Sequence, residues 1–229
     1  MNILKTSVAL TLLPLALAST AALAAPPEQV HTYSVEFNEQ GQVTATSLHA
    51  GPANADAAVI EQQLRDWQFQ PLAGANRVQS YVRIISQPDA SGQPQLLSVS
   101  TGPAPAALKL PEYPQSAQRF GEEGVVVLKL QLDSHGQVVA RQVHATEGQV
   151  SRRMAASAMN SASRWRFAPE RINGQAQAGS VLVPVCFYVS DDRQSACQWS
   201  GADDAAMSGL AMPALMPSAQ LLYPVANTD

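Results

Sequence analysis

The residues of this 229-residue chain that most readily do chemistry are four histidines and two cysteines. A nucleophile with its base, or a set of three metal ligands, needs such residues at short spacings or in a known motif. The sequence has no nucleophile elbow, no H-E-x-x-H pair and no phosphate-binding glycine loop. The histidines are His31, His49, His135 and His144. We therefore expect no catalytic residue, no metal site, no cofactor and no enzymatic activity.

The two cysteines are Cys186 and Cys197. In an exported chain, a lone pair of cysteines forms a disulfide by default. The loop that this bond closes is short, so its stabilisation is about 2 to 3 kcal/mol at best. Two free thiols are the alternative. Zinc is disfavoured, because no further histidine or cysteine pair lies nearby at ligand spacing.

The start of the chain indicates export. Residues 1–5 carry one positive charge, residues 6–21 are apolar and uncharged, and residues 22–24 (Ala-Leu-Ala) give the small-x-small pattern that a signal peptidase accepts. A membrane anchor is the alternative. A spanning helix needs about 20 strongly apolar residues, however, and Pro14 together with several Ser and Thr residues dilutes this stretch. We predict a signal peptide at residues 1–24, cleaved near Ala24/Ala25.

The composition narrows the choice of partners. Charged residues make up 14% of the chain and its net charge is −4. A lightly charged, mildly acidic protein is a poor match for the phosphate backbone of nucleic acid. We therefore expect no nucleic-acid partner.

The second half of the chain predicts a hairpin, a helix and a strand, in that order. Residues 125–145 alternate apolar and polar side chains on both sides of a turn at residues 133–136, which is typical of a β-hairpin. Residues 150–166 place apolar side chains at steps of three and four, as one helical face requires. Residues 180–189 are dense in β-branched and aromatic residues, which favour a strand.

The first half repeats this pattern. Gly-Gln-Val occurs at residues 41–43 and again at 136–138, and each of these is followed, a few residues on, by a His-Ala pair. A helix-compatible stretch then ends in W-x-F-x-P in both halves, and a closing strand is predicted at residues 79–86 of the first. We expect the aromatic pairs of the two motifs to dominate two small cores. These core residues are Trp67, Phe69, Trp165 and Phe167.

Residues 111–190 resemble the C-terminal domain of TonB, the periplasmic energy transducer. The resemblance rests on short motifs in a fixed order. These are Tyr113-Pro114, a Gly-rich start of the first strand at 121–125, the hairpin turn at 133–136, Trp165 to Pro169, Gly174, and Val-Pro-Val at 183–185. Residues 28–87 keep the hairpin and W-x-F-x-P but lack the Tyr-Pro motif and the Gly-rich start, so they look like a degenerate copy.

The resemblance implies an α+β fold of two units, each a three-stranded antiparallel sheet (hairpin, helix, strand) packed on a helix. We expect a degenerate unit at 25–87, a linker at 88–110 in which residues 95–99 could form a short strand, and a TonB-like domain at 111–199. The tail at 200–229 has no steady period, and we expect it to be disordered or docked as an extended segment.

The resemblance also implies a peptide site in the periplasm. In the family, the closing strand is an exposed edge to which an extended segment of an outer-membrane receptor adds as a further strand. Here the edge strand would comprise Val181, Leu182, Val183, Val185, Phe187 and Val189. Pro184 would interrupt the pairing if its missing N–H faced the partner.

Three functions remain open from the sequence. The first is a periplasmic binding or adaptor protein that holds a receptor peptide or another envelope component, peptidoglycan included. The second is a membrane-anchored transducer whose first 24 residues stay uncleaved, although the long Pro-rich spacer of a transducer is missing. The third is a structural envelope protein whose edges are capped by its own chain. A homodimer is compatible with any of them.

Overall fold

The computed structural model describes residues 27–189 and three two-residue strands at 198–199, 207–208 and 214–215. The predicted signal peptide and most of the predicted tail lie outside these residues. No helix in the described ranges is long and apolar enough to cross a membrane.

The first half forms a hairpin, a helix and a closing strand. These elements are β1 (Gln29–Asn38), β2 (Val43–Ala50), α1 (Ala55–Leu64) and β3 (Arg77–Pro88). Both neighbours of β1 run antiparallel to it, which gives the strand order β2-β1-β3. The side chain of Asn54 caps α1 by accepting the N–H of the third residue on, at 3.0 Å. Such a cap satisfies one of the donors that a helix start leaves open.

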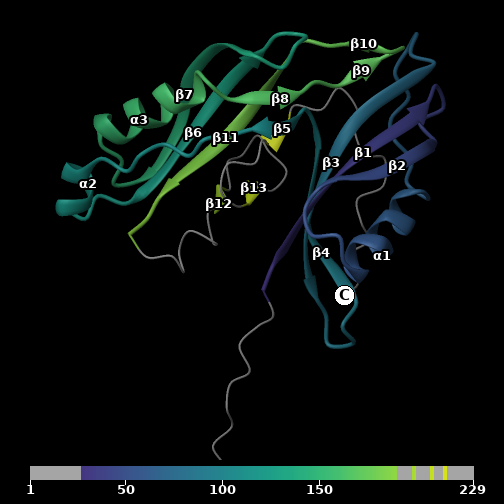
Figure 1. Ribbon diagram of the computed structural model, residues 1–229, viewed down its shortest axis with the longest axis horizontal. Coiled ribbons are helices and arrows are strands. Elements are labelled where there is room, and N and C mark those ends of the chain that lie inside the picture. The colour runs from purple at the N-terminus through teal and green to yellow at the C-terminus, as the bar shows by residue number, and fades with distance from the viewer. Residues whose placement is uncertain (1–26, 190–197, 200–206, 209–213, 216–229) are drawn as a thin grey trace, which may run out of the picture.

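The second half repeats this order with one helix added in front. Its elements are α2 (Gln115–Arg119), β6 (Gly124–Leu132), β7 (Val138–Gly148), α3 (Arg152–Ala162) and β11 (Gly179–Phe187). Strand β6 lies between its hairpin partner and the closing strand, so the order β7-β6-β11 matches that of the first half. In Figure 1, α2 and α3 lie on one side of the molecule, α1 lies on the other, and the sheets lie between them.

The predicted linker is more regular than we expected. It contains β4 (Pro94–Gly102), which pairs along β3 from Tyr81 to Pro88, and β5 (Ala104–Ala107). Strand β5 pairs with β8 (Arg166–Ala168), the segment that follows α3. The free edge of β3 supplies hydrogen-bonding groups for β4, which is why a segment rich in Pro, Gly and Ser becomes a strand.

A second unpredicted feature is the small hairpin that joins the halves. It consists of β9 (Arg171–Ile172) and β10 (Gln175–Ala176), and β9 pairs with β3 at Val78 and Gln79. The first sheet is therefore completed by strands from the second half, and its order reads β10-β9-β3-β1-β2 with β4 beside β3.

The short strands near the C-terminus also take part in pairing. Strands β12 (Gln198–Trp199) and β13 (Met207–Ser208) pair with each other, and β14 (Ala214–Leu215) pairs with β11. The second sheet therefore has the order β14-β11-β6-β7. The three strands predicted for each half, β2-β1-β3 and β7-β6-β11, lie next to one another at one end of these larger sheets, and the added strands extend each sheet from its closing strand, β3 or β11.

Each half has its own core beneath its helix. Phe69 is fully buried in the first, and Trp165 and Phe167 are buried in the second, where they pack with α3 and the inward side of β6. Trp67 is only partly buried and packs against the first core from its margin. Four residues of the predicted apolar helical face are buried, namely Met154, Ala158, Ser161 and Ala162.

Both hairpins contact the extended segment that follows the helix in the same way. The Phe69 N–H donates to the Gly41 carbonyl at 2.7 Å, and the Phe167 N–H donates to the Gly136 carbonyl at 2.9 Å. Both glycines have positive φ, +80° and +73°, and a Cβ at either would overlap the carbonyl oxygen of the phenylalanine. Only glycine fits these positions.

The hairpins also share their irregularities. Each pairing skips two residues of its second strand, Thr44 and His49 in β2 and Val139 and His144 in β7. Such β-bulges leave one residue unpaired and increase the local twist. The two bulges are five residues apart in both strands.

Candidate functional site

The closing strand of the second half, β11, is the most regular strand of its sheet. It pairs with β6 over nine consecutive residue pairs, from Gly179–Leu132 to Phe187–Gly124, without a register shift. A strand this regular presents its outer backbone groups at even spacing. This spacing is what an added strand needs.

The side chains predicted to form the peptide site are part of the protein interior. Val181, Val183, Val185 and Phe187 are buried in the core beneath α3. Leu182 faces the opposite side of the sheet, where it packs with Val125 and Val127. These side chains hold β11 in place, so what the strand itself can offer a partner is its backbone.

Val189 is not part of the strand, contrary to our prediction. Strand β11 ends at Phe187, and Val189 is 63% exposed. Its backbone N–H donates to the Glu123 carboxylate at 2.9 Å. This hydrogen bond turns the chain toward the loop that precedes β6 and ends the ladder.

The Tyr-Pro motif supports the same end of β11. The ring of Tyr113 lies edge-on against Phe187, with 5.4 Å between ring centroids, and its hydroxyl donates to the Glu122 carbonyl at 2.5 Å. Burial, together with the nearby carboxylates of Glu123 and Glu122, raises the pKa of the Tyr113 phenol. The phenol therefore remains a neutral donor well above neutral pH.

The outer edge of β11 already carries a strand. Strand β14 runs antiparallel to it, with Val181 opposite Leu215 and Leu182 opposite Ala214. The described ladder comprises these two pairs and ends before Pro184. Residues 190–197, which connect β11 to β12, lie outside the described residues.

The predicted disulfide remains a prediction. Cys186 lies in β11 and is buried, with 6% of its surface exposed. Cys197 lies outside the described residues. Strand β12, which begins at the next residue, pairs with β13.

The opposite end of the sheet, β7, is less suited to strand addition. Within the described residues it is the last strand of its sheet, and most of its side chains are exposed. Its two bulges, at Val139 and His144, break the even spacing of the backbone groups. Bulges and charged residues on an edge are common protections against edge-to-edge pairing.

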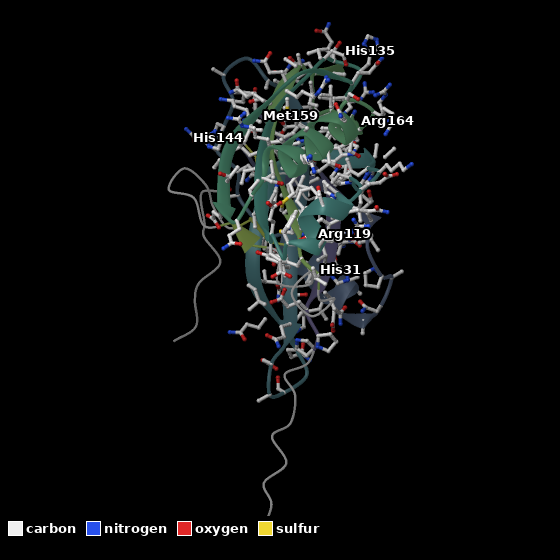
Figure 2. All side chains as sticks on the ribbon, turned by 90° about the vertical axis from the view of Figure 1, so that its left-hand side faces the viewer. His31, Arg119, His135, His144, Met159 and Arg164 are labelled. Carbon is white, nitrogen blue, oxygen red and sulfur yellow. The ribbon has the colours of Figure 1, made fainter. Side chains whose placement is uncertain are left out.

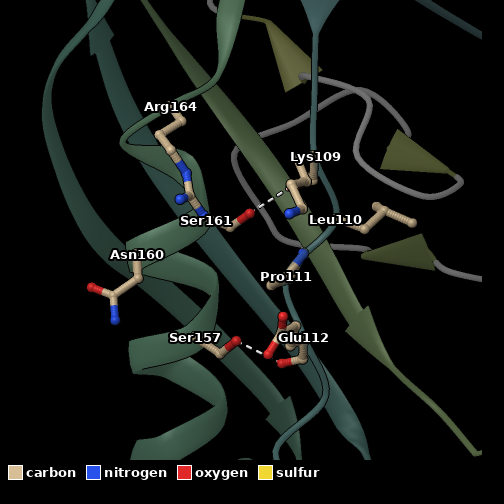
Figure 3. A pocket seen from close by; sticks show the side chains of 8 residues that line it. All are labelled: Lys109, Leu110, Pro111, Glu112, Ser157, Asn160, Ser161 and Arg164. Atoms are coloured by element: carbon tan, nitrogen blue, oxygen red, sulfur yellow. Dashed lines mark hydrogen bonds between the residues drawn. The ribbon is translucent and has the colours of Figure 1, made fainter.

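A shallow pocket of about 240 Å³ lies between α3 and the extended segment at 109–112. Figure 3 shows that the two serine hydroxyls in it point at this segment: Ser157 donates to the Glu112 carbonyl at 2.6 Å and Ser161 to the Lys109 carbonyl at 2.5 Å. The Lys109 carbonyl also accepts the Trp165 indole N–H at 2.8 Å. The hydroxyls thus hold the backbone in place, and the residues lining the pocket include no histidine or cysteine.

The histidines do not gather into a site. Figure 2 shows His31, His135 and His144 well apart along the molecule. Among the described residues, no group of three or more His, Cys, Asp or Glu side chains is placed to hold a metal ion. His31 is fully buried at one end of the first core and stacks near Tyr33, with 6.2 Å between ring centroids.

Comparison with known proteins assigns the second half to a family. Residues 109–189 match the family model for the C-terminal region of the Gram-negative bacterial TonB protein. "Protein TonB" of Xanthomonas campestris pv. campestris is 36% identical over 80 residues, which are 35% of this chain and 35% of that protein. "Protein TonB" of Vibrio cholerae serotype O1 is 28% identical over 104 residues, which are 45% of this chain and 38% of that protein.

The matched region spans little more than a third of these curated relatives. It begins just before the Tyr-Pro motif and ends just after β11, so it covers α2, β6, β7, α3 and β11 but not β14. Residues 109–189 are therefore a domain of the TonB C-terminal family.

Proposed function

We propose that this chain is an exported binding or adaptor protein of the cell envelope. Its TonB-like domain would hold an extended peptide of an outer-membrane receptor, or of another envelope protein, by strand addition at the outer edge of β11. The observation that carries the proposal is the pairing of β14 with this edge, because the edge accepts an antiparallel strand in register. The regular ladder of β11 and the bulges of β7 favour the same edge.

Strand addition makes a specific demand on the ligand. Main-chain hydrogen bonds give most of the affinity, while side chains on alternate residues give the register. The interior position of Val183, Val185 and Phe187 restricts their role to supporting the strand. Replacing backbone amides of the ligand is therefore a sharper test than replacing side chains of the protein.

The experiment uses the mature full chain and fluorescein-labelled peptides from the N-terminal segments of outer-membrane receptors, read by fluorescence anisotropy. For a peptide that binds, two N-methylated versions are compared. One carries methyl groups on every second amide, and the other carries them on the remaining amides. Since only one set of amides faces β11, one version should lose binding at least tenfold while the other keeps it.

Hydrogen exchange locates the contact. Binding should slow the exchange of β11 amides and leave those of β7 unchanged. Equal losses for the two N-methylated peptides, or protection confined to β7, would sink the proposal. So would the absence of binding to any receptor segment.

We also infer that the unit predicted at residues 25–87 is a degenerate second copy of the same fold. The shared order of elements, the paired bulges and the two glycine contacts support this. In this copy the outer edge of the closing strand β3 is occupied by β4 and β9. The first half would then act as a scaffold, and the second half would carry the binding edge.

A structural envelope protein with self-capped edges is the second candidate, since the pairing of β14 favours it as well. It differs from the first in one outcome: no extended peptide would displace β14 from β11 at any concentration tested. A membrane-anchored transducer is the third. N-terminal sequencing of the protein from cells separates it from the others, because cleavage near Ala25 would rule it out.

A further inference from the structure

The pocket beside α3 is held in shape by the protein's own hydrogen bonds. It lies between the C-terminal half of α3 and the extended segment at 109–112 (Figure 3). Three hydrogen bonds, from two serine hydroxyls of α3 and from the Trp165 indole, fasten the backbone of this segment. Trp165 itself is fully buried. The two walls are therefore fixed relative to each other, and a ligand would meet a pocket that is already formed.

Two cations line this pocket from opposite walls. Lys109 belongs to the extended segment and Arg164 to the turn that follows α3, and both side chains are exposed. In Figure 3 the Arg164 side chain turns back along the last turn of α3 toward Ser161, with Lys109 across from it. The salt bridges among the described residues join other side chains. Both cations are therefore available to a negative charge on a ligand.

The end of α3 does not oppose an anion as strongly as a bare helix end would. The last carbonyls of a helix carry partial negative charge. In α3 the carbonyls at 160–162 accept hydrogen bonds from the Ser163 hydroxyl and from the N–H groups of Arg164 and Trp165. These bonds reduce the negative potential at this end, and the guanidinium adds a full positive charge beside it.

The third charged residue of the pocket restricts the choice of anion. Glu112 lies at the far end of the segment, and its carboxylate makes no salt bridge with either cation. A phosphate monoester carries about −1.5 to −2 at pH 7, so Glu112 would repel it more than it repels a single carboxylate. Leu110 is half exposed beside Lys109 and adds apolar surface. A peptide residue with one carboxylate matches this lining better than a phosphate or a polyanion does.

The size of the pocket agrees with such a ligand. Pockets that enclose a whole small molecule measure about 300 to 1,000 Å³. This one measures about 240 Å³. It has room for a side chain or a chain end and leaves the rest of a peptide outside.

We propose that this pocket binds a single carboxylate group of a peptide between the Arg164 guanidinium and the Lys109 ammonium. Arginine can hold both carboxylate oxygens through two parallel N–H bonds, whereas lysine acts as a point charge. The carboxylate belongs either to an Asp or Glu side chain or to a chain end. No residue of the pocket lies in β11, so the inference goes beyond strand addition and does not depend on it.

The first experiment titrates three short peptides into the isotope-labelled mature full chain and follows the NMR shifts of the amides at 109, 110 and 164. Acetyl-Ala-Glu-Ala-amide carries a side-chain carboxylate, acetyl-Ala-Ala-Ala carries a C-terminal one, and acetyl-Ala-Gln-Ala-amide carries none. At least one of the two acidic peptides should shift these amides, and which one does so identifies the source of the carboxylate. Equal shifts with the Gln peptide, or no shift with any peptide, would overturn the proposal.

The second experiment compares charge variants with the acidic peptide that binds. Arg164→Gln and Lys109→Gln should each weaken binding by about tenfold, because each removes a charged hydrogen-bond donor. Arg164→Lys should lose less, since it keeps the charge and loses only the paired N–H bonds. Arg153→Gln is the matched control: it removes one exposed charge from the same helix, outside the pocket. Equal losses in Arg153→Gln and Arg164→Gln would mean a general effect of net charge and would overturn the site.

Inorganic phosphate serves as the competing anion. Tighter binding of phosphate than of the acidic peptide, at the same ionic strength, would assign the pocket to a phosphate group and contradict the proposal. The outcome is separate from that of strand addition, which is read from the amides of β11. Loss of peptide binding at β11 with intact binding at 109 and 164 would leave the pocket standing and remove the proposed function.

Discussion

Gly136 fixes the hairpin of the TonB-like domain to the segment that follows α3. Its carbonyl accepts the Phe167 N–H, and its missing side chain leaves room for the Phe167 carbonyl. Phe167 is a core residue, so the position of the turn is tied to the packing beneath α3. Gly41 makes the same contact with Phe69 in the first half. At the scale of single residues, these contacts are the clearest likeness between the halves.

Gly136→Ala should lower the unfolding free energy by more than the backbone strain of a positive φ alone would cause, because a Cβ there also overlaps the Phe167 carbonyl oxygen. Gly174 is a matched control, since its φ is +82° and a Cβ there would meet nothing within 4 Å. Gly174→Ala should cost about 1 to 2 kcal/mol of unfolding free energy, the usual penalty of the left-handed region. Gly136→Ala should cost about 1 to 3 kcal/mol more, because the chain must move to relieve the overlap. Urea denaturation measures both, and equal losses would contradict the close approach.

Tyr33 should make the stability fall at high pH. Its buried hydroxyl donates to the Ala57 carbonyl at 2.8 Å, and burial, with a contribution from the Glu61 carboxylate, raises the pKa of Tyr33 well above its usual value of about 10. Above pH 10 the unfolded chain releases this proton while the folded chain retains it. The unfolded state then binds fewer protons, so stability is lost as the pH rises.

Tyr33→Phe tests this dependence. At pH 7 the variant should be less stable by about 1 kcal/mol, because the Ala57 carbonyl loses its partner. The difference between wild type and variant should shrink above pH 10, since only wild type carries the unfavourable linkage at this site. Burial also raises the pKa values of Tyr81 and Tyr113, but these residues are present in both proteins. A constant difference from pH 7 to 11 would contradict the assignment.

At the scale of elements, one turn type recurs in three hairpins. Residues 38–42, 89–93 and 133–137 share an Asn or Asp at the first position and Gly-Gln at the last two. In each, the first side chain accepts the N–H of the final Gln at 2.8 to 3.0 Å. The Ser91 hydroxyl, and after it the Gln93 N–H, lower the pKa of the Asp89 carboxyl. The Gln137 N–H lowers the pKa of the Asp133 carboxyl in the same way.

This recurrence also shows what the sequence could and could not predict. Alternation and helical spacing located both hairpins, both long helices and the closing strands. The turn at 89–93 carries the same signal and predicts the β3–β4 hairpin, but the Pro, Gly and Ser content around it favours a linker. Strands β9, β10 and β14 have two residues each, too few for a period, and they form because a neighbouring edge offers hydrogen bonds. The backbone edge of β11 leaves no side-chain signature either.

The cap of α1 should carry a measurable part of the stability of the first half. Asn54 accepts the Ala57 N–H at 3.0 Å and donates to the Gln29 side chain at 2.7 Å. Asn54→Ala should lower the unfolding free energy by about 1 kcal/mol, and Asn54→Ser should recover most of it because a hydroxyl can still cap the helix. Chemical denaturation gives both values. A loss of equal size in the two variants would assign the effect to the contact with Gln29 and not to the cap.

At the scale of the whole molecule, the two halves are joined by more than a chain connection. Strand β9 extends the first sheet, and Ile172 packs against the first core. The Ser80 hydroxyl donates to the Glu170 carboxylate at 2.5 Å, and both side chains are buried. Because the joining hairpin lies between β8 and β11, the position of β11 is linked to the first half. This favours a scaffold role for that half.

Asn173 is the residue through which this joint is most easily tested. Its side-chain oxygen accepts the N–H groups of Asn76 and Arg77 at 2.8 and 3.2 Å, and its side-chain nitrogen donates to the Gly74 carbonyl at 3.0 Å. Its backbone N–H donates to the Arg77 carbonyl at 2.8 Å, and its φ of +52° is the only positive value of a non-glycine residue in the described part of the chain. Asparagine tolerates this conformation better than most residues do.

Asn173→Gly removes the side-chain contacts without strain, so it should loosen the joint specifically. We expect a loss of about 1 to 3 kcal/mol, given the usual net strength of three hydrogen bonds. In scanning calorimetry we expect wild type to unfold in a single transition, and this transition should become broader or divide in two in Asn173→Gly, as the halves unfold less cooperatively. Asn173→Asp is the control, because it keeps the acceptor for two of the three bonds and should retain most of the cooperativity. If Asn173→Gly unfolds in one transition at the temperature of wild type, the halves are held together by β9 and the buried Ser80–Glu170 contact without help from this side chain.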